Sequence, residues 1–295
     1  MTLSEQDLGK LDYLAAGNFS KVYLAPDLKL PEAPTGKWVY KKFKPKFRPI
    51  PAFGMNSIVT HRTNMHEDQR AQFDSVAVWP TRVVADDGAG AAGVVLPLIP
   101  DDYFHTLSLS TSTKRIPSEG QFLFMDREYC SSVGLTFLEE DARRKIAHRL
   151  AYAFALFHKA NVVYGDFSSR NFIFRTMPTP RVLLVDCDAV RVNFEPSPFG
   201  GQPHSPDWEP PEALKAKRLK DSAGFSIQNM ETDRYKLGLA ILRVLTPGAY
   251  CSTNRDPERA RAVLPPKLFQ LLERSLSEHP TARPTAKEWY QEMLR

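Results

Sequence analysis

The sequence predicts an α+β fold in two parts, a small β-rich N-terminal lobe followed by a larger helical lobe. Five short segments before residue 97 are apolar and are separated by turn-forming residues, which is typical of strands. Beyond residue 100 the apolar residues recur with the period of helices. Pro97-Leu98-Ile99-Pro100 interrupts both patterns, so we expect residues 1–97 and 98–295 to form separate lobes joined by a short hinge.

The expected N-terminal lobe consists of a five-stranded sheet and one helix. Its expected strands are residues 13–14, 22–24, 38–43, 79–84 and 92–96, and its helix is residues 56–73. The small residues from Ala15 to Ser20 would form the loop of the first hairpin and would let backbone N–H groups approach a phosphate. By composition, residues 45–54 form a proline-rich loop and residues 86–90 form a turn.

The strand at residues 38–43 carries two adjacent lysines. Side chains alternate along a strand, so Lys41 and Lys42 are expected on opposite faces of the sheet. Of the two acids in the middle of the predicted helix, Glu67 has the longer side chain and is better suited than Asp68 to pair with a strand lysine. The alternative is that Glu67 is simply solvated on the helix surface.

The second lobe is expected to contain helices at residues 138–159, 212–223, 233–245 and 267–276 and a last helix that begins at Thr285. The helix at 233–245 is apolar on nearly all sides, which predicts a buried central position. Thr285-Ala286-Lys287-Glu288 has the pattern of a capping box. Residues 101–136 show no clear period, and their Ser/Thr-rich part, Ser108 to Thr113, indicates a surface loop. Residues 191–211 contain six prolines and predict a long loop, a feature that in compact domains is often functional.

Two apolar segments, residues 172–174 and 182–185, flank a proline-containing turn and predict an antiparallel hairpin. Asn171 precedes the first strand and Asp186 follows the second, so both are expected at the open end of this hairpin. Asp166 lies a few residues upstream. These oxygen-bearing side chains suit Mg²⁺ held against a phosphate, because this ion prefers oxygen and takes few protein ligands. The alternative, that the three are ordinary turn formers, does not explain their joint placement.

The composition is that of a globular protein and argues against several classes of function. A formal net charge of +5 is small and dispersed, so we expect no nucleic-acid partner. The three cysteines are far apart and show no CxxC spacing, which predicts neither a zinc site nor a disulfide framework. No apolar run reaches the length of a membrane span, and the N-terminus lacks a signal pattern. We therefore expect a cytoplasmic protein that does not contact a membrane.

The order of these parts resembles a protein kinase-like domain over almost the whole chain. The segment from Leu14 to Tyr23 resembles the glycine-rich loop, although Gly17 is its only glycine, and Lys41 matches the strand lysine that contacts nucleotide phosphates. Leu96 falls at the gatekeeper position that precedes the hinge. The resemblance thus implies that ATP and Mg²⁺ are bound by Gly17, Val22, Lys41, Glu67, Leu96, Pro97, Ile99, Asn171 and Asp186.

The catalytic motifs of that family are matched in an altered form. Tyr164-Gly165-Asp166 stands where the family has His-Arg-Asp, which makes Asp166 the residue that orients or deprotonates the attacking hydroxyl. Asn171 matches the metal-binding asparagine five residues on. Asp186-Cys187-Asp188 replaces Asp-Phe-Gly, which makes Asp186 the second magnesium ligand.

Further resemblances support a protein substrate. Pro210-Pro211-Glu212 resembles the end of the activation segment, and its glutamate would pair with Arg283. Asp233 resembles the residue that anchors the central buried helix. The altered motifs together resemble a divergent bacterial branch of Ser/Thr kinase-like proteins, often encoded near PP2C-type phosphatases and von Willebrand factor A proteins, which are therefore possible partners.

Three departures from the family bear on activity. Ser168 stands where Ser/Thr kinases carry a lysine, so it can contact a phosphate by a hydrogen bond but brings no charge. Gly165 removes the arginine that normally binds an activation-loop phosphate, which argues against regulation by that phosphorylation and for a constitutively formed or partner-gated site. Cys187 replaces the packing phenylalanine.

The resemblance implies an ATP- and Mg²⁺-dependent kinase that transfers the γ-phosphate to Ser or Thr hydroxyls of a protein. Lys41, Asp166 and Ser168 would be its catalytic residues. One alternative is a pseudokinase scaffold that binds nucleotide weakly or not at all and acts through protein contacts. Another is transfer to a small molecule, which the pairing of Glu212 with Arg283 makes the weaker choice.

Overall fold

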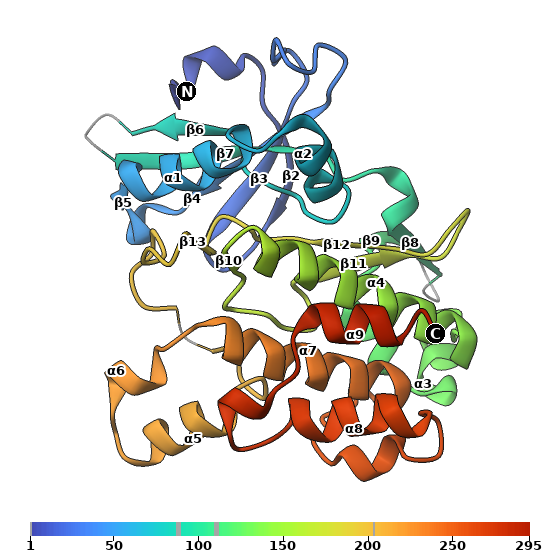
Figure 1. Ribbon diagram of the computed structural model, residues 1–295. Coiled ribbons are helices and arrows are strands. Elements are labelled where there is room, and N and C mark those ends of the chain that lie inside the picture. The colour runs from blue at the N-terminus through green and yellow to red at the C-terminus, as the bar shows by residue number, and fades with distance from the viewer. Residues whose placement is uncertain (1, 87–89, 109–111, 203) are drawn as a thin grey trace. The chain divides into compact units, whose positions relative to one another are not determined.

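The computed structural model describes residues 2–86, 90–108, 112–202 and 204–295, which form an α+β fold (Figure 1). The chain divides into two compact units. Unit 1 contains the residues up to Ile99 and also Asp186–Gly201, and unit 2 contains Pro100–Val185 and Gln202–Arg295. The first division falls close to the expected hinge. The assignment of Asp186–Gly201 to unit 1 differs from the prediction, which placed all residues after 97 in the second lobe.

The sheet of unit 1 has seven strands in the order β1-β6-β7-β4-β3-β2, with β5 paired to β7. Their bounds are β1 Thr2–Leu3, β2 Asp12–Ala16, β3 Ser20–Ala25, β4 Trp38–Phe43, β5 Ile50–Pro51, β6 Arg82–Ala85 and β7 Gly90–Pro97. The strand β1 runs parallel to β6, and the other pairs are antiparallel. The five expected strands are present within a few residues. The prediction missed β1 and β5, since strands of two residues show no period. Of the expected turn at 86–90, residues 87–89 lie outside the described residues.

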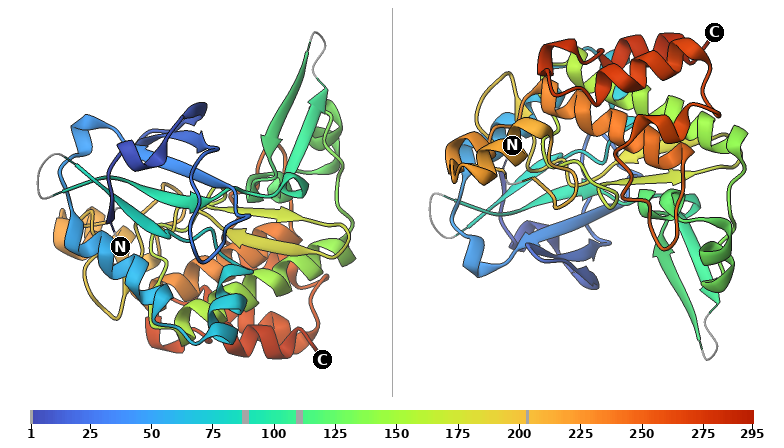
Figure 2. Two further views of the ribbon diagram at one scale, coloured as in Figure 1. Left: turned by 90° about the horizontal axis from the view of Figure 1, so that it is seen from above. Right: turned by 90° about the horizontal axis from the view of Figure 1, so that it is seen from below.

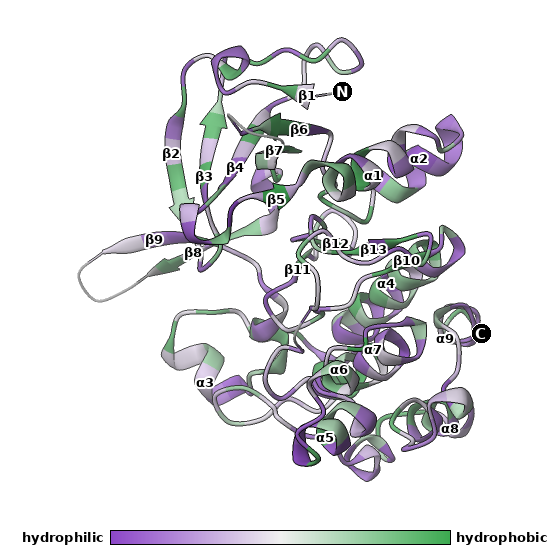
Figure 3. Cartoon of the chain, turned by 90° about the vertical axis from the view of Figure 1, so that its left-hand side faces the viewer, coloured by the Kyte–Doolittle hydropathy of each residue, from purple (hydrophilic) through white to green (hydrophobic). Residues whose placement is uncertain are grey.

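Unit 1 has two α-helices where the sequence predicted one at residues 56–73. The first, α1, spans Ala52–Thr63, and the second, α2, spans Glu67–Asp74. The helix α1 begins inside the expected proline-rich loop and buries Met55, Ile58 and Val59. Figure 3 shows α2 as largely hydrophilic, and Phe73 is its one buried residue. A single continuous helix would have needed an apolar stripe across both segments, which α2 lacks.

The remaining elements of unit 1 are short. They are the 3-10 turns Gln6–Leu8 and Pro45–Phe47 and the strand β13, Arg191–Val192, which contacts α1. The core behind the sheet includes Leu8, Trp38, Tyr40, Val84 and Val95, all buried. The strand β4 therefore lies inside the sheet, between β3 and β7, and contributes Trp38 and Tyr40 to this core.

Unit 2 is mainly helical. Its helices are α3 Arg127–Ser132, α4 Glu140–Lys159, α5 Pro211–Arg218, α6 Ser222–Phe225, α7 Met230–Leu245, α8 Pro266–Ser275 and α9 Ala286–Glu292. Its strands are β8 Phe104–Ser108, β9 Thr113–Pro117, β10 Val162–Val163, β11 Phe172–Arg175 and β12 Arg181–Leu184. Its 3-10 turns are Asp101–Tyr103, Gly120–Phe124, Pro257–Ala260 and Pro280–Ala282. The central helix α7 packs against α4 and α8, and α9 packs on α4.

Several helix predictions for unit 2 are confirmed. The helix α7 is buried on nearly all sides, as the all-round apolar pattern indicates. It begins with a capping box formed by Asn229 and Thr232. The predicted capping box at the start of α9 is also present, with both of its hydrogen bonds between Thr285 and Glu288. The helix expected at 212–223 is divided into α5 and α6.

Residues 101–136, for which the sequence gave no clear pattern, contain the hairpin β8–β9 and the helix α3. Figure 2 shows this hairpin projecting from the helices of unit 2. Residues 109–111 of the expected Ser/Thr-rich loop, and residue 203 of the expected long loop at 191–211, lie outside the described residues. Among the helices that are described, none combines the length and apolar character that a membrane crossing requires.

Candidate functional site

Lys41 lies in the middle of β4 and forms two ion pairs within unit 1. Its ammonium nitrogen is 2.9 Å from Oδ1 of Asp186 and 2.7 Å from Oδ1 of Asp188. The neighbouring Lys42 pairs instead with Glu5 at 2.7 Å. The two lysines thus have different partners, in agreement with the predicted alternation of faces. The buried lysine of the pair is Lys41, whose side chain is 11% exposed.

The charges of this cluster stabilise one another. Burial alone would lower the pKa of Lys41, but the carboxylates of Asp186 and Asp188 outweigh burial and raise it. The ammonium of Lys41 in turn lowers the pKa of Asp186. Lys41 and Asp186 are therefore both charged at neutral pH.

Glu67 does not take part in this cluster, so of the two alternatives that the sequence left open for it, pairing with Lys41 or solvation on the helix surface, the structure shows the second. It is exposed in the first turn of α2, where a carboxylate is stabilised by the helix dipole. In the described residues, both carboxylates that hold Lys41 come from the segment 186–188. Sequence reasoning missed Asp188 because the corresponding position in the kinase family is a glycine.

The other residues predicted to bind the nucleotide lie on or beside the same sheet. Val22 of β3 is directly opposite Lys41 in the ladder, and Val94 of β7 is opposite Lys41 on the other side. Leu96 is two residues from Val94 on the same strand, so its side chain shares that face. Pro97 ends β7. Ile99, partly buried, is the last residue before the division between the units.

Gly17 lies in the turn between β2 and β3, where its N–H donates to the carbonyl of Ser20 at 2.9 Å. A Cβ at position 17 would meet no atom within 4 Å in the described structure. Packing therefore does not require a glycine at this position. The absence of a side chain instead leaves the turn backbone open, which suits the predicted approach of a phosphate.

The predicted hairpin in unit 2 is confirmed as β11 and β12. Phe172 pairs with Leu184, and the N–H of Val185 donates to the carbonyl of Asn171 at 3.0 Å. Tyr164 adds hydrogen bonds from its hydroxyl to the carbonyls of Asn171 and Val185. Asn171 and the residue that precedes Asp186 are thus fixed together at the open end of the hairpin.

Asp166 and Asn171 are brought together in unit 2. The amide nitrogen of Asn171 donates to the backbone carbonyl of Asp166 at 2.5 Å, which leaves the amide oxygen for another partner. The Asp166 carboxylate accepts hydrogen bonds from the backbone N–H of Ser205 at 3.0 Å and from its hydroxyl at 2.7 Å. Ser168 is buried, and its carbonyl accepts from the N–H of Asn171 at 3.1 Å. The Asp166 carboxylate is therefore already placed to accept a hydrogen bond from a hydroxyl.

The loop that carries Asp166 is anchored on α7. Asp233 accepts hydrogen bonds from the backbone N–H groups of Tyr164 at 2.7 Å and Gly165 at 2.9 Å. The ammonium of Lys236 donates to the carbonyl of Gly165 at 2.6 Å. The anchoring role expected for Asp233 is thus present. Lys236 was missed, although a lysine inside an otherwise apolar helix was a visible signal.

Position 165 requires a glycine, both because of its backbone conformation and because a neighbouring side chain leaves no room for a Cβ. Its φ is +79°, and a Cβ at this position would lie 2.1 Å from Oε1 of Gln202. Gln202 therefore occupies the space that any larger side chain at position 165 would need. Lys236 also donates to Gln228 at 3.0 Å, and Gln228 donates to the carbonyl of Gln202 at 3.4 Å. These bonds tie residue 202 to the loop that carries Asp166.

The predicted pairing of Glu212 with Arg283 is confirmed. Two guanidinium nitrogens of Arg283 donate to the two carboxylate oxygens of Glu212 at 2.8 and 2.7 Å. Arg283 is buried and also donates to the carbonyl of Glu231 at 3.0 Å. This bidentate pair fixes the start of α5 to the turn before α9.

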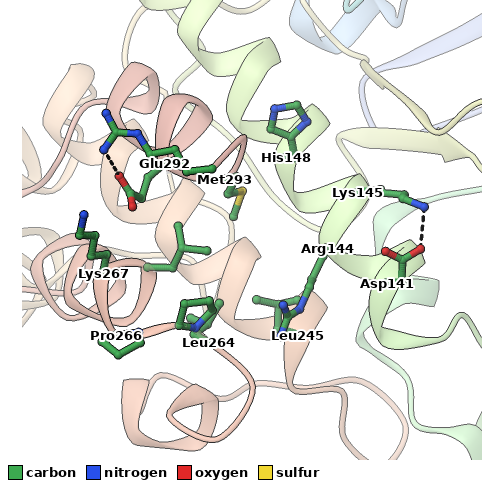
Figure 4. A pocket seen from close by; sticks show the side chains of 13 residues that line it. Asp141, Arg144, Lys145, His148, Leu245, Leu264, Pro266, Lys267, Glu292 and Met293 are labelled. Carbon is green, nitrogen blue, oxygen red and sulfur yellow. Dashed lines mark hydrogen bonds and ion pairs between the residues drawn. The ribbon is translucent and has the colours of Figure 1, made fainter.

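A pocket with a volume of about 740 Å³ lies within unit 2 (Figure 4). Leu245, Leu264 and Met293 contribute apolar surface to it, and Arg144 and Lys267 contribute positive charge. The described residues that line this pocket include none of the predicted site residues. Elsewhere in the described ranges, no group of three or more His, Cys, Asp or Glu side chains is arranged to hold a metal.

Comparison with known proteins adds no family assignment. No protein-family model matches the chain, and a search of curated proteins gave no significant match.

Proposed function

We propose that this protein is a Mg²⁺- and ATP-dependent protein kinase of bilobal kinase-like fold that phosphorylates Ser or Thr hydroxyls. The observation that carries the proposal is the pairing of the buried Lys41 with Asp186, 145 residues away in the sequence and 2.9 Å away in space. A cation and a carboxylate so placed suit a phosphate and the magnesium ion bound to it. The α+β fold and the division into two units are compatible with this proposal.

The donor set fits magnesium and the phosphates of ATP. Asp186 has a side chain that is 59% exposed and charged, so its second oxygen is accessible to a metal. Asn171, the other ligand that the resemblance implies, uses its amide nitrogen for the carbonyl of Asp166, so its amide oxygen is available to a metal. Bound Mg²⁺ would neutralise charge on the phosphate oxygens. Lys41 would hold the phosphates from β4, and Gly17, Val22, Leu96, Pro97 and Ile99 would contact the rest of the nucleotide.

Asp166 is assigned to the substrate hydroxyl. Its carboxylate accepts a hydrogen bond from the Ser205 hydroxyl, which is the same kind of contact that a substrate Ser or Thr would make. Asp166 would orient the hydroxyl for in-line attack and accept its proton, while Ser168 would donate a hydrogen bond to the transferred phosphoryl group. The fixed segment that leads from Ser205 to the Glu212–Arg283 pair favours a peptide substrate. A co-encoded PP2C phosphatase or von Willebrand factor A protein is the partner that we propose.

Asp166→Asn tests this assignment. We expect kcat for phosphate transfer from labelled ATP, to the protein itself or to a general protein substrate, to fall by about 10²- to 10⁴-fold. The stabilisation of the protein by Mg²⁺ and ATP should be unchanged, because Asp166 is assigned to the hydroxyl. Asp68→Asn, at an exposed position of α2, is the matched control and should keep the wild-type rate. Wild-type turnover by Asp166→Asn would contradict the assignment.

A pseudokinase scaffold is the second candidate, and one observation favours it. Lys41 is already held by two carboxylates, so a phosphate must compete with them for the ammonium. A thermal shift with Mg²⁺ and ATP separates the two functions. ATP at about 100 times its Kd should raise the free energy of unfolding by about 2.7 kcal/mol if it binds. No shift, together with no phosphate transfer, would favour the scaffold.

A further inference from the structure

The two carboxylates that hold Lys41 differ sharply in burial. The side chain of Asp188 is 3% exposed, whereas that of Asp186 is 59% exposed. Asp188 also makes the shorter contact, 2.7 Å against 2.9 Å. An exposed carboxylate can turn toward a metal ion at little cost, because water already solvates it. A buried carboxylate cannot lose its cation without a large penalty.

The helices of unit 1 supply no carboxylate to Lys41. The sequence of α1 contains no acidic residue. In α2, Glu67 and Asp68 are exposed in the first turn, and Asp74 forms a two-point ion pair with Arg62 at 2.5 and 2.6 Å. The acidic side chains of these two described helices are thus either exposed or paired with Arg62. The buried carboxylate that binds Lys41 is that of Asp188.

We propose that Asp188 is the positioning residue for Lys41, and that it holds the ammonium toward the phosphates while Asp186 is left to bind Mg²⁺. The inference deepens the proposed kinase function and rests on it. In most protein kinases a glutamate from a helix of the N-terminal lobe holds this lysine. Here a carboxylate two residues after the metal ligand does so.

This arrangement has a consequence for regulation. The partner of Lys41 and the metal ligand Asp186 belong to one short segment, so both are set by the position of residues 186–188. That segment is held to unit 1 beyond Asp188 as well. The hydroxyl of Ser197 donates to the carbonyl of Ala189 at 2.8 Å and so closes the segment on itself, and Phe199 packs edge-on against Phe43 of β4 with ring centres 5.5 Å apart. Displacement of residues 186–188 would therefore remove the partner of Lys41 and the metal ligand together.

A stability experiment tests the pairing independently of any activity. Lys41→Met should lower Tm, because it leaves the Asp188 carboxylate buried without a cation. Adding Asp188→Asn should restore most of the loss, since it removes that charge. Adding Asp186→Asn should restore little, because Asp186 is exposed. Rescue by Asp186→Asn and not by Asp188→Asn would overturn the proposal.

Kinetics provide a second test if Lys41→Met does not fold. Asp188→Asn should raise KM for ATP by at least about tenfold, and Asp188→Glu should recover part of the loss. Glu67→Gln should keep KM and kcat within about twofold of the wild type. The opposite pattern, with Glu67→Gln impaired and Asp188→Asn normal, would overturn the assignment. If the wild type transfers no phosphate, the proposed kinase function fails, and the stability experiment still decides whether Asp188 is the partner of Lys41.

Discussion

Single buried side chains of α7 set the shape of the proposed catalytic loop. Asp233 accepts hydrogen bonds from the backbone N–H groups of Tyr164 and Gly165, and Lys236 donates a hydrogen bond to the carbonyl of Gly165. Lys236 is fully buried, and burial lowers its pKa to about 8, although Asp233 and Asp166 act in the opposite direction. Lys236 is thus less basic than an ordinary lysine, and its hydrogen bond to Gly165 helps to fix the loop that carries Asp166.

Lys236 should give the stability of the protein a distinct pH dependence. Between pH 8 and the ordinary lysine pKa of 10.5, the unfolded chain binds a proton at Lys236 that the folded chain has released. The free energy of unfolding contributed by this group therefore rises with pH in that window, and the full penalty is present below pH 8. Urea denaturation should measure this as a change in the free energy of unfolding of the wild type relative to that of Lys236→Met. From pH 8 to pH 10.5, the wild type should gain roughly 3 kcal/mol of stability over the variant. A difference that is constant with pH would contradict this account.

The residues of the site were predictable where a motif fixes their place. The two strands of the hairpin near Asp166, Asn171 and Asp186 were predicted from their apolar residues. The structure forms that hairpin as β11 and β12. The partner of Lys41 was not predictable in the same way. An acid at position 188 follows no periodic pattern, and only the folded unit shows that its carboxylate is buried against the lysine.

Elements with a strong apolar pattern were also predictable. The helices α4 and α7 are close to their expected bounds because each carries a continuous apolar face. The break between α1 and α2 was missed, because Asn64 to His66 contains neither proline nor glycine. The strand β5 was missed because it has two residues and is held by pairing with β7, which is a tertiary interaction.

The contact between α5 and the turn before α9 should depend on one ion pair. Glu212→Ala would leave the guanidinium of Arg283, whose side chain is 0% exposed, without its carboxylate. We expect the free energy of unfolding to fall by about 3 kcal/mol, measured by urea denaturation. The control is Glu258→Ala, which removes an exposed pair with Arg261 and should have a much smaller effect. Equal losses in the two variants would show that the Glu212–Arg283 pair does not stabilise this contact.

At the scale of the whole molecule, the chain returns to unit 1 after it has built much of unit 2. Asp186–Gly201 belongs to unit 1, and its first residues bind Lys41 from 145 and 147 positions away. Sequence patterns describe neighbours along the chain, so they could indicate the first division between the units but not this return. The proposed phosphate and metal ligands thus depend on the long-range fold, and the proposed chemistry follows from it.

The most direct test of the proposed function is the rate of labelled phosphate transfer from ATP to protein as Mg²⁺ is titrated. We expect transfer by the wild type that requires Mg²⁺ and that falls by about a hundredfold or more in Asp186→Ala. Asp68→Ala, which removes an exposed acid of α2, should behave as the wild type. Mg²⁺-dependent transfer that is unchanged in Asp186→Ala would contradict the account.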